Sequence, residues 1–293
     1  MANTIAGVNP TRIAQLTLDS LKPVSFPFDA FTTNFSDEIA SSGDAVVTRY
    51  VTNPVTQDFN ANKNVGNSTL TARTTTLYHY VGVSLGFTDK ENSLSDIQLV
   101  QQFIGPAICA LWQNVFTNVS SLILNASFSN VVYTAPQFSA TNVAAISNVM
   151  TIANVQTYNR HLVIKPSYAY TLKTDTAVQA SYAYGNNQAV STGTLPDVYG
   201  FKIHETSMSI PSNSENLEGW ACTPQGLLIA TRVPALPRNW AGQVMNVTDP
   251  GSGLTVQYRD WYDGTTQRTE LCMIYGAQIG VTGNLLAIRK ANS

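Results

Sequence analysis

The apolar residues between positions 93 and 125 recur at steps of three and four, which is the spacing of an α-helix with one buried face. Ser95 and Gln98 have the spacing of a capping box at its amino end. The pattern therefore predicts one helix, roughly 45–50 Å long. Gly105 and Pro106 follow its third turn, and proline lacks the backbone donor that a helix interior needs. We expect a bend there, which would make these two residues a hinge.

Alternating apolar and β-branched residues predict two strands before this helix, at 43–51 and 74–87. Positions 52–76 hold seven threonines and five asparagines but few large apolar side chains, so this segment cannot bury a core of its own. A long polar insertion between two strands predicts a projecting hairpin that is ordered by contact with another molecule. Its candidate contact residues are Arg49, Phe59, Lys63 and Arg73.

The rest of the chain mixes short helices with strands. Helices are expected near 142–153 and 167–175, a buried strand is expected to stop at Pro166, and further strands are expected near 198–211, 219–234 and 254–290. Asp263 and Gly264 lie between two β-rich runs, which predicts a hairpin. The sequence therefore predicts an α+β fold, with the long helix against an antiparallel sheet whose strands come from both ends of the chain.

Two segments have the composition of irregular structure. Residues 1–38 combine prolines with spaced aromatic side chains, so we expect an extended arm that packs on something else; a partly disordered terminus is the alternative. Positions 177–196 are rich in small and polar residues, which predicts a flexible loop.

Only 12% of the 293 residues are charged, about half the share of an ordinary soluble domain, and the net charge is −2. A surface of this kind is either rich in neutral amides or buried against copies of itself. No basic stripe is present to grip nucleic acid, so specific DNA binding is not expected. Polar residues interrupt the most apolar segment and the start lacks an export signal, so we expect neither a membrane span nor secretion.

No group of residues predicts catalysis. The three cysteines share no short spacing, which argues against a disulfide framework or a zinc site, and we expect small buried side chains. His79, His161 and His204 are isolated within strand-like runs; local hydrogen bonding is favoured over a three-histidine metal site. No nucleotide-binding or hydrolase motif occurs. We therefore expect no enzyme activity, no metal and no cofactor.

Six segments follow one another in a recognisable order. They comprise an arm with an outgoing strand, a returning strand, a helix containing a proline, a strand–proline–helix unit, a glycine-containing strand pair and a set of closing strands, at 35–51, 74–87, 103–124, 160–172, 195–211 and 268–290. This order resembles the major capsid proteins of tailed bacteriophages, with the Hong Kong 97 phage type of fold. The resemblance covers essentially the whole chain and rests on the order of the parts.

The resemblance implies a division of the chain into an N-terminal arm, an extended loop hairpin with its base strands, a peripheral domain with a long spine helix, an axial domain, and peripheral return strands, at 1–38, 39–88, 89–131, 132–245 and 246–293 respectively. Tyr184, Asn186 and Asn187 would then belong to an axial loop at the centre of each capsomer.

The implied function is self-assembly, as pentamers and hexamers, into an icosahedral shell around packaged double-stranded DNA held by non-specific contact. The implied partners are a portal protein, a separate scaffold protein and a decoration or cement protein, without a membrane. Assembly would occur in the cytoplasm of a bacterial host, and the product would be the virion capsid. Some relatives crosslink a loop lysine to a neighbour; Lys63 is the candidate here, without an identifiable acid and asparagine to match it.

Three other interpretations stay open. An encapsulin-like compartment has the same fold and encloses an enzyme. A different structural virion protein or an adhesin is also typically rich in β-structure, threonine and asparagine. A hydrolase whose site is assembled from distant residues is the third, and the tryptophans and tyrosines could line a ligand cleft, although such residues are more often found in cores and interfaces.

Overall fold

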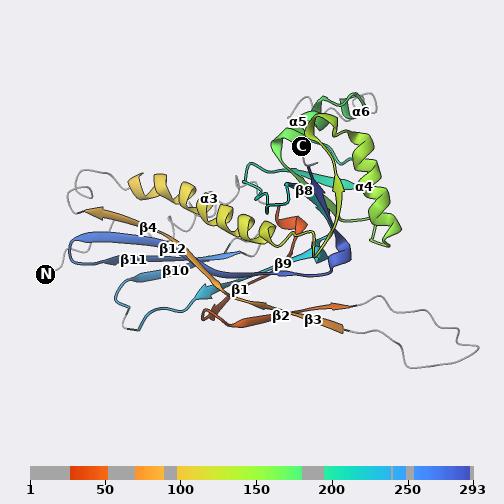
Figure 1. Ribbon diagram of the computed structural model, residues 1–293. Coiled ribbons are helices and arrows are strands. Elements are labelled where there is room, and N and C mark those ends of the chain that lie inside the picture. The colour runs from red at the N-terminus through yellow and green to blue at the C-terminus, as the bar shows by residue number, and fades with distance from the viewer. Residues whose placement is uncertain are drawn as a thin grey trace, which may run out of the picture.

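The computed structural model describes residues 27–51, 70–88, 98–179, 195–238, 240–248 and 254–290. These residues form one long helix, two mixed sheets and a separate two-stranded ribbon (Figure 1). The predicted α+β class is confirmed. The prediction of a single antiparallel sheet is wrong, because the strands divide between two sheets and three of the strand pairs are parallel.

The larger sheet has six strands and lies beneath the long helix. Its strands, in order, are β1 (Thr32–Ala40), β9 (Leu227–Pro234), β12 (Thr266–Ile279), β11 (Thr255–Tyr262) and β10 (Gln243–Thr248), and β4 (His79–Thr88) also pairs with β12. The first part of β12 pairs with both β4 and β11, and its last part pairs with β9. The predicted hairpin is confirmed, because Gly264 joins β11 to β12 with a φ of +97° that favours glycine.

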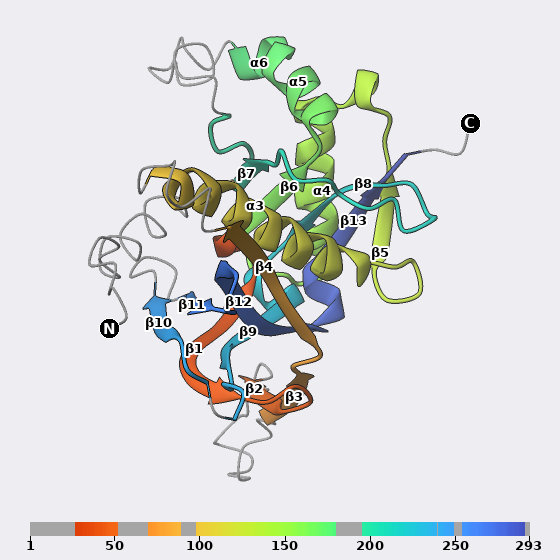
Figure 2. The ribbon, with the colours of Figure 1, turned by 90° about the vertical axis from the view of Figure 1, so that its left-hand side faces the viewer.

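The smaller sheet has its own layer of helices. Its strands, in order, are β5 (Ser129–Val132), β13 (Leu285–Arg289), β8 (Leu217–Cys222), β6 (Arg160–Ile164) and β7 (Phe201–Glu205). Residues of α4 (Ala140–Ile152), α5 (Pro166–Thr174) and α6 (Thr176–Gln179) share a hydrophobic core with this sheet. All of β6 is buried and the strand ends before Pro166, as the sequence predicts, whereas the following helix begins one residue earlier than expected, at Pro166. Figure 2 shows α5 and α6 at the opposite end of the molecule from the ribbon.

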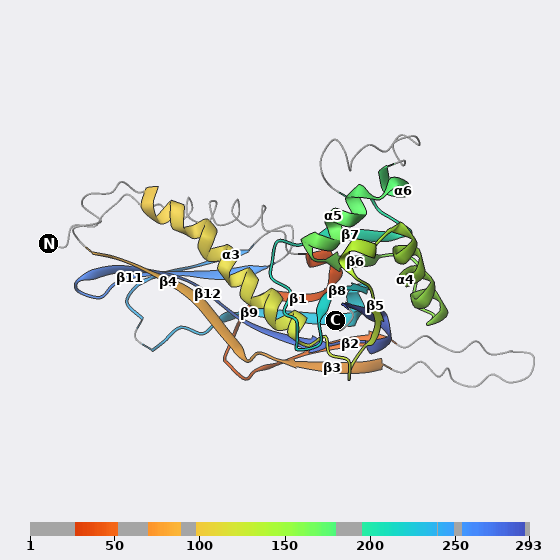
Figure 3. The same ribbon diagram turned by 45° about the horizontal axis from the view of Figure 1, so that its top comes forward.

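The long helix is α3 (Gln98–Ser121), which has 24 residues and lies along the larger sheet (Figures 1 and 3). Where its side chains are described, the predicted apolar stripe is buried against this sheet, and two aromatic residues beside the stripe widen the contact. The buried residues are Ile108, Leu111, Trp112, Val115, Phe116 and Val119. Cys222 and Cys272 are buried as expected, whereas Cys109 is exposed because it follows Ile108 and faces away from the stripe.

Tertiary contacts set the end and the orientation of α3. The helix ends at Ser121, earlier than predicted, because the Asn213 side chain donates hydrogen bonds to the carbonyls of Ser120 and Ile123 at 2.9 and 3.0 Å. On β12, the Tyr275 hydroxyl donates to Asn114 Oδ1 of α3 at 2.7 Å. Ser95, the predicted cap, lies outside the described residues. None of the described helices is long and apolar enough to cross a membrane.

The ribbon consists of β2 (Ala45–Val51) and β3 (Leu70–Thr76), which pair with each other as a separate two-stranded sheet. Its base crosses β12 at Gly276, where an added Cβ would lie 2.3 Å from the carbonyl oxygen of Thr76. Leu77, which follows β3, is fully buried in a small cluster with Ala40, Ala230 and Ile274. The ribbon is therefore fastened to the body at its base, and Figure 1 shows it as a separate element outside both sheets.

Candidate subunit-interface surfaces

The two faces of the ribbon differ in what they present. Residues paired across an antiparallel ribbon share a face, and neighbours along a strand alternate. Arg73 pairs with Thr48 whereas Arg49 pairs with Ala72, so the two predicted contact arginines lie on opposite faces. Both are exposed, and neither forms an ion pair with another residue in the described part of the chain. Each face of the described ribbon therefore carries one arginine that has no ion-pair partner among the described residues.

The face that carries Arg73 contacts the protein body at both ends of the described ribbon, at Thr75 near the base and at Tyr50 near the other end. Tyr50 is 9% exposed and Thr75 is fully buried. The Asn34 side chain of β1 donates a hydrogen bond to Thr48 Oγ1 at 3.3 Å. Burial raises the pKa of the Tyr50 hydroxyl, which fits a side chain packed against the body. This face is partly used by the fold itself.

The opposite face is solvent-exposed along its described length. Val47 and Leu70 are 50% and 56% exposed, which is unusual for large apolar side chains in a strand. We call this surface the outer ribbon face; its residues are Ala45, Val47, Arg49, Leu70, Ala72, Thr74 and Thr76. An apolar strip with one cation at its side has the composition of a protein contact surface rather than of a solvated edge.

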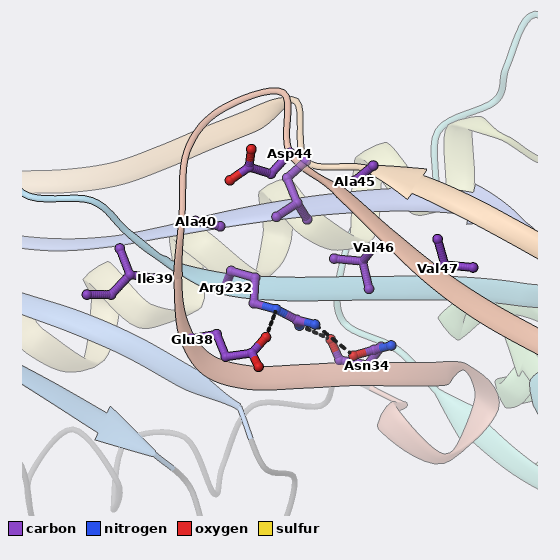
Figure 4. Close-up of a pocket in the computed structure, with 10 residues that line it drawn as sticks. Asn34, Glu38, Ile39, Ala40, Asp44, Ala45, Val46, Val47 and Arg232 are labelled. Atoms are coloured by element: carbon purple, nitrogen blue, oxygen red, sulfur yellow. Dashed lines mark hydrogen bonds and ion pairs between the residues drawn. The ribbon is translucent and has the colours of Figure 1, made fainter.

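An open hollow of about 480 Å³ lies at the base of the ribbon, between β1 and β2 (Figure 4). Its apolar wall includes Ile39, Val46 and Val47, and the carboxylates of Glu38 and Asp44 lie at its rim. Val47 belongs both to this hollow and to the outer ribbon face, so the two surfaces are continuous.

Arg232 of β9 holds the floor of the hollow in place (Figure 4). Its Nη1 donates to the carbonyls of Asn34 and Thr231, both at 2.8 Å, and its Nη2 donates to Asn34 Oδ1 at 3.1 Å. Its Nε lies 3.4 Å from the Glu38 carboxylate, whose side chain is 75% exposed. Because each nitrogen of Arg232 has a partner, this side chain joins β1 to β9, while most of Glu38 stays open to solvent.

The remaining predicted site residues are the hairpin-tip residues, the axial-loop residues and the two hinge residues of α3. Phe59 and Lys63, from the tip of the hairpin, lie outside the described residues, and so do Tyr184, Asn186 and Asn187. Gly105 and Pro106 lie within α3, with Pro106 exposed. Their role as a hinge stays a prediction.

Two of the three histidines meet in space, although all three are isolated in the sequence. β6 and β7 pair in parallel, which brings His161 Nδ1 within 3.0 Å of His204 Nε2. His79 lies on β4 in the larger sheet, where its ring stacks on Tyr275 with centroids 4.9 Å apart. The three rings do not converge on one site. The sequence carried no signal for the pair because only strand pairing brings positions 161 and 204 together.

The sequence matches no protein-family model and no curated protein. The fold matches several solved shell structures. The capsid of cyanophage P-SCSP1u is similar with a TM-score of 0.59 and 15% identity, over 90% of this chain and 88% of that chain. The capsid of Ralstonia phage GP4 is similar with a TM-score of 0.54 and 13% identity, over 90% of this chain and 88% of that chain. A virus-like particle from Pyrococcus furiosus is similar with a TM-score of 0.53 and 9% identity, over 95% of this chain and 98% of that chain.

The fold of this chain is therefore similar to that of solved capsid and head structures of bacteriophages. The resemblance drawn from the order of six sequence segments is therefore confirmed at the level of the fold. The similarity extends over about nine tenths of the chain, so it is not limited to one local motif.

Proposed function

We propose that this chain is a major capsid protein that self-assembles as pentamers and hexamers into an icosahedral shell around phage double-stranded DNA. The observation that carries the proposal is the similarity to phage capsid structures over about 90% of the chain. The exposed ribbon supports it, because a two-stranded ribbon with an apolar outer face gains stability when a neighbouring subunit covers that face.

The proposed division of the chain follows from the same likeness. The larger sheet with α3 would form the peripheral domain, with α3 as its spine helix, and the smaller sheet with α4, α5 and α6 would form the axial domain at 132–245. Two strands interlock these parts. β9, within the proposed axial range, lies in the larger sheet, and β13, among the return strands of 246–293, lies in the smaller one. The two parts would therefore move as one body. The proposed arm at 1–38 and loop at 39–88 contribute β1 and β4 to the larger sheet of this body.

The partners in this proposal are further copies of the chain, a portal protein, a separate scaffold protein and a decoration or cement protein. Packaged DNA would contact the inner wall without sequence specificity, since only 12% of the residues are charged and the net charge is −2. Assembly would take place in the cytoplasm of the bacterial host, and the assembled protein would be part of the virion.

A shell that encloses cargo other than DNA is the second candidate. The observation in its favour is the similarity to a virus-like particle from Pyrococcus furiosus, which covers 95% of this chain. Both candidates share the requirement that the chain closes into a shell, and they differ in what the shell contains.

Electron microscopy of the purified full-length protein, expressed in bacteria, tests both candidates. Icosahedral particles or rings of five and six subunits are expected, whereas spikes, fibres or a persistent monomer would contradict the shell proposal. The contents then discriminate: DNA that resists added nuclease in particles from infected or co-expressing cells supports the capsid. Particles that hold a co-purifying protein and no nucleic acid would support the compartment instead.

A further inference from the structure

The His161–His204 contact has the geometry of a shared-proton pair. The two rings are nearly parallel, with centroids 5.3 Å apart and an interplanar angle of 21°. His161 is 2% exposed. Its Nε2 lies 2.9 Å from Asn159 Oδ1, an acceptor, so Nε2 carries a proton and Nδ1 is left to accept. His204 Nε2–H therefore donates to His161 Nδ1, and the pair is satisfied when both rings are neutral.

Proton uptake conflicts with this arrangement. If both rings were protonated, each of the two facing nitrogens would carry a hydrogen, and the 3.0 Å contact would join two donors. A single added proton held between the rings would place a charge beside the buried His161 ring, although His204 is partly exposed. Burial lowers the pKa of both histidines, that of His204 to about 4.

The charged and titratable groups around the pair come from each element packed against it. Lys202 on β7 lowers the pKa of both rings, while Asp29 on η1 (Phe28–Ala30) raises both. Asp197, in the segment before β7, raises that of His161. On β8 the neighbour is Cys222, a neutral thiol whose pKa burial raises to about 12. Burial therefore outweighs the two carboxylates.

The turn η1 packs against β6 of the smaller sheet, the strand that carries His161. The Asp29 carboxylate forms an ion pair with Lys202, and Cys222 Sγ donates to the Ala30 carbonyl at 3.3 Å. Ala30 and Phe31 are buried at 1% and 3% exposure. Because η1 packs on β6, which carries the buried His161, lifting η1 would give water access to a charged His161 ring.

We propose that His161 and His204 form an acid-sensitive clasp, which holds η1 on the smaller sheet while both rings are neutral and releases it when they take up protons. The direction of the pH effect follows from the linkage between proton binding and the stability of each state. The released state binds protons near the ordinary pKa of about 6.5, whereas the clasped state binds them only at lower pH, so acid favours release. The release is expected between roughly pH 6.5 and 4, and it is independent of whether the chain forms a shell.

Hydrogen exchange at a series of pH values, corrected for the intrinsic exchange rate, tests the clasp on the full-length protein. In the wild type, residues 27–31 should lose protection as the pH falls through this window, while β12 stays protected. His204→Gln keeps a donor toward His161 without titrating, so its midpoint should move at least one pH unit lower. His79→Gln, which changes the histidine outside the pair, should match the wild type.

Two results would overturn the clasp: protection of residues 27–31 that does not change with pH in the wild type, or the same midpoint in His204→Gln as in the wild type. If His204→Gln does not fold, NMR titration of the three histidines in the wild type decides the question. The His161 and His204 rings should then titrate well below the ordinary histidine pKa of about 6.5, and ordinary titrations of both near pH 6.5 would contradict the proposal.

Discussion

At the residue scale, Arg160 shows how a charge is held inside this protein without a carboxylate. The side chain is 1% exposed. Its Nε donates to the Gln156 carbonyl at 2.7 Å, and its Nη1 donates to the carbonyl and hydroxyl oxygens of Ser147 at 3.0 and 3.1 Å. Its Nη2 donates to Thr151 Oγ1 at 3.2 Å and to the Val155 carbonyl at 2.7 Å. The guanidinium thus satisfies the carboxyl end of α4, where the helix dipole favours a cation.

Replacing Arg160 with methionine should therefore lower the free energy of unfolding by about 3 kcal/mol, because several buried carbonyl groups lose their donor at once. Urea denaturation followed by circular dichroism measures this. Arg49→Met is the matched control, since Arg49 is exposed on the outer ribbon face, and its change should stay within about 0.5 kcal/mol. Equal losses for the two variants would show that the Arg160 network contributes little.

At the element scale, the ribbon is positioned by a close backbone contact at its base. An added Cβ at Gly276 would meet the Thr76 carbonyl oxygen at 2.3 Å and the Thr75 side chain at 2.9 Å. Thr76 is the last residue of β3, so the absence of a side chain at Gly276 lets the ribbon cross β12 where it does. The sequence shows the glycine, but only the crossing shows why it is needed.

Gly276→Ala should destabilise the protein by about 1–3 kcal/mol, because β3 or β12 must shift to make room. Thermal or urea unfolding measures the change. Gly283→Ala serves as the control, as no atom lies within 4 Å of the position its Cβ would take. A Gly276→Ala variant as stable as Gly283→Ala would mean that the base of the ribbon is loosely packed.

The helix α3 has a predicted bending point at Gly105 and Pro106. It passes through Gly105 and Pro106 without a break, and the proline removes one backbone hydrogen bond from the interior of the helix. We expect the helix to bend by different amounts in different subunits of one shell, or before and after maturation. Cryo-microscopy that resolves the separate subunits measures these angles. The same curvature in every subunit and in both states would rule out a hinge at these residues.

At the scale of the whole molecule, two hydrophobic cores meet through shared strands while the ribbon stays outside both. Leu271 and Met273 of β12 belong to the core under α3, and Leu286 and Ile288 of β13 belong to the core under α4. β12 and β13 follow each other directly in the chain, so the two cores are connected by a short link. Loss of the ribbon tip should therefore leave both cores folded.

Deleting residues 53–73 should leave a soluble, folded subunit that no longer forms shells. Circular dichroism and gel filtration report the folded subunit, and electron microscopy reports the shells. The subtler variant Val47→Asp places a charge on the outer ribbon face, with Val47→Thr as its control because threonine keeps the β-branched shape. Shells formed as usual by the deletion variant would contradict the role of the ribbon in assembly.

Several features could be predicted from local patterns. The buried stripe of α3, the buried strand that stops before Pro166 and the hairpin at Asp263 and Gly264 each depend on residues close in sequence, whose spacing or backbone preference is decisive. The order of these elements was sufficient to indicate the capsid type of fold.

Only the tertiary structure decided which distant residues meet. The division into two sheets and the parallel pairing of β6 with β7 depend on which distant strands pair. The opposite faces of Arg49 and Arg73 depend on the register of β2 and β3, because a shift of one residue moves a side chain to the other face. The early end of α3 depends on Asn213, about 90 residues away in the chain. Such contacts bring together positions with no local pattern in common, so the composition and periodicity of the sequence carry no record of them.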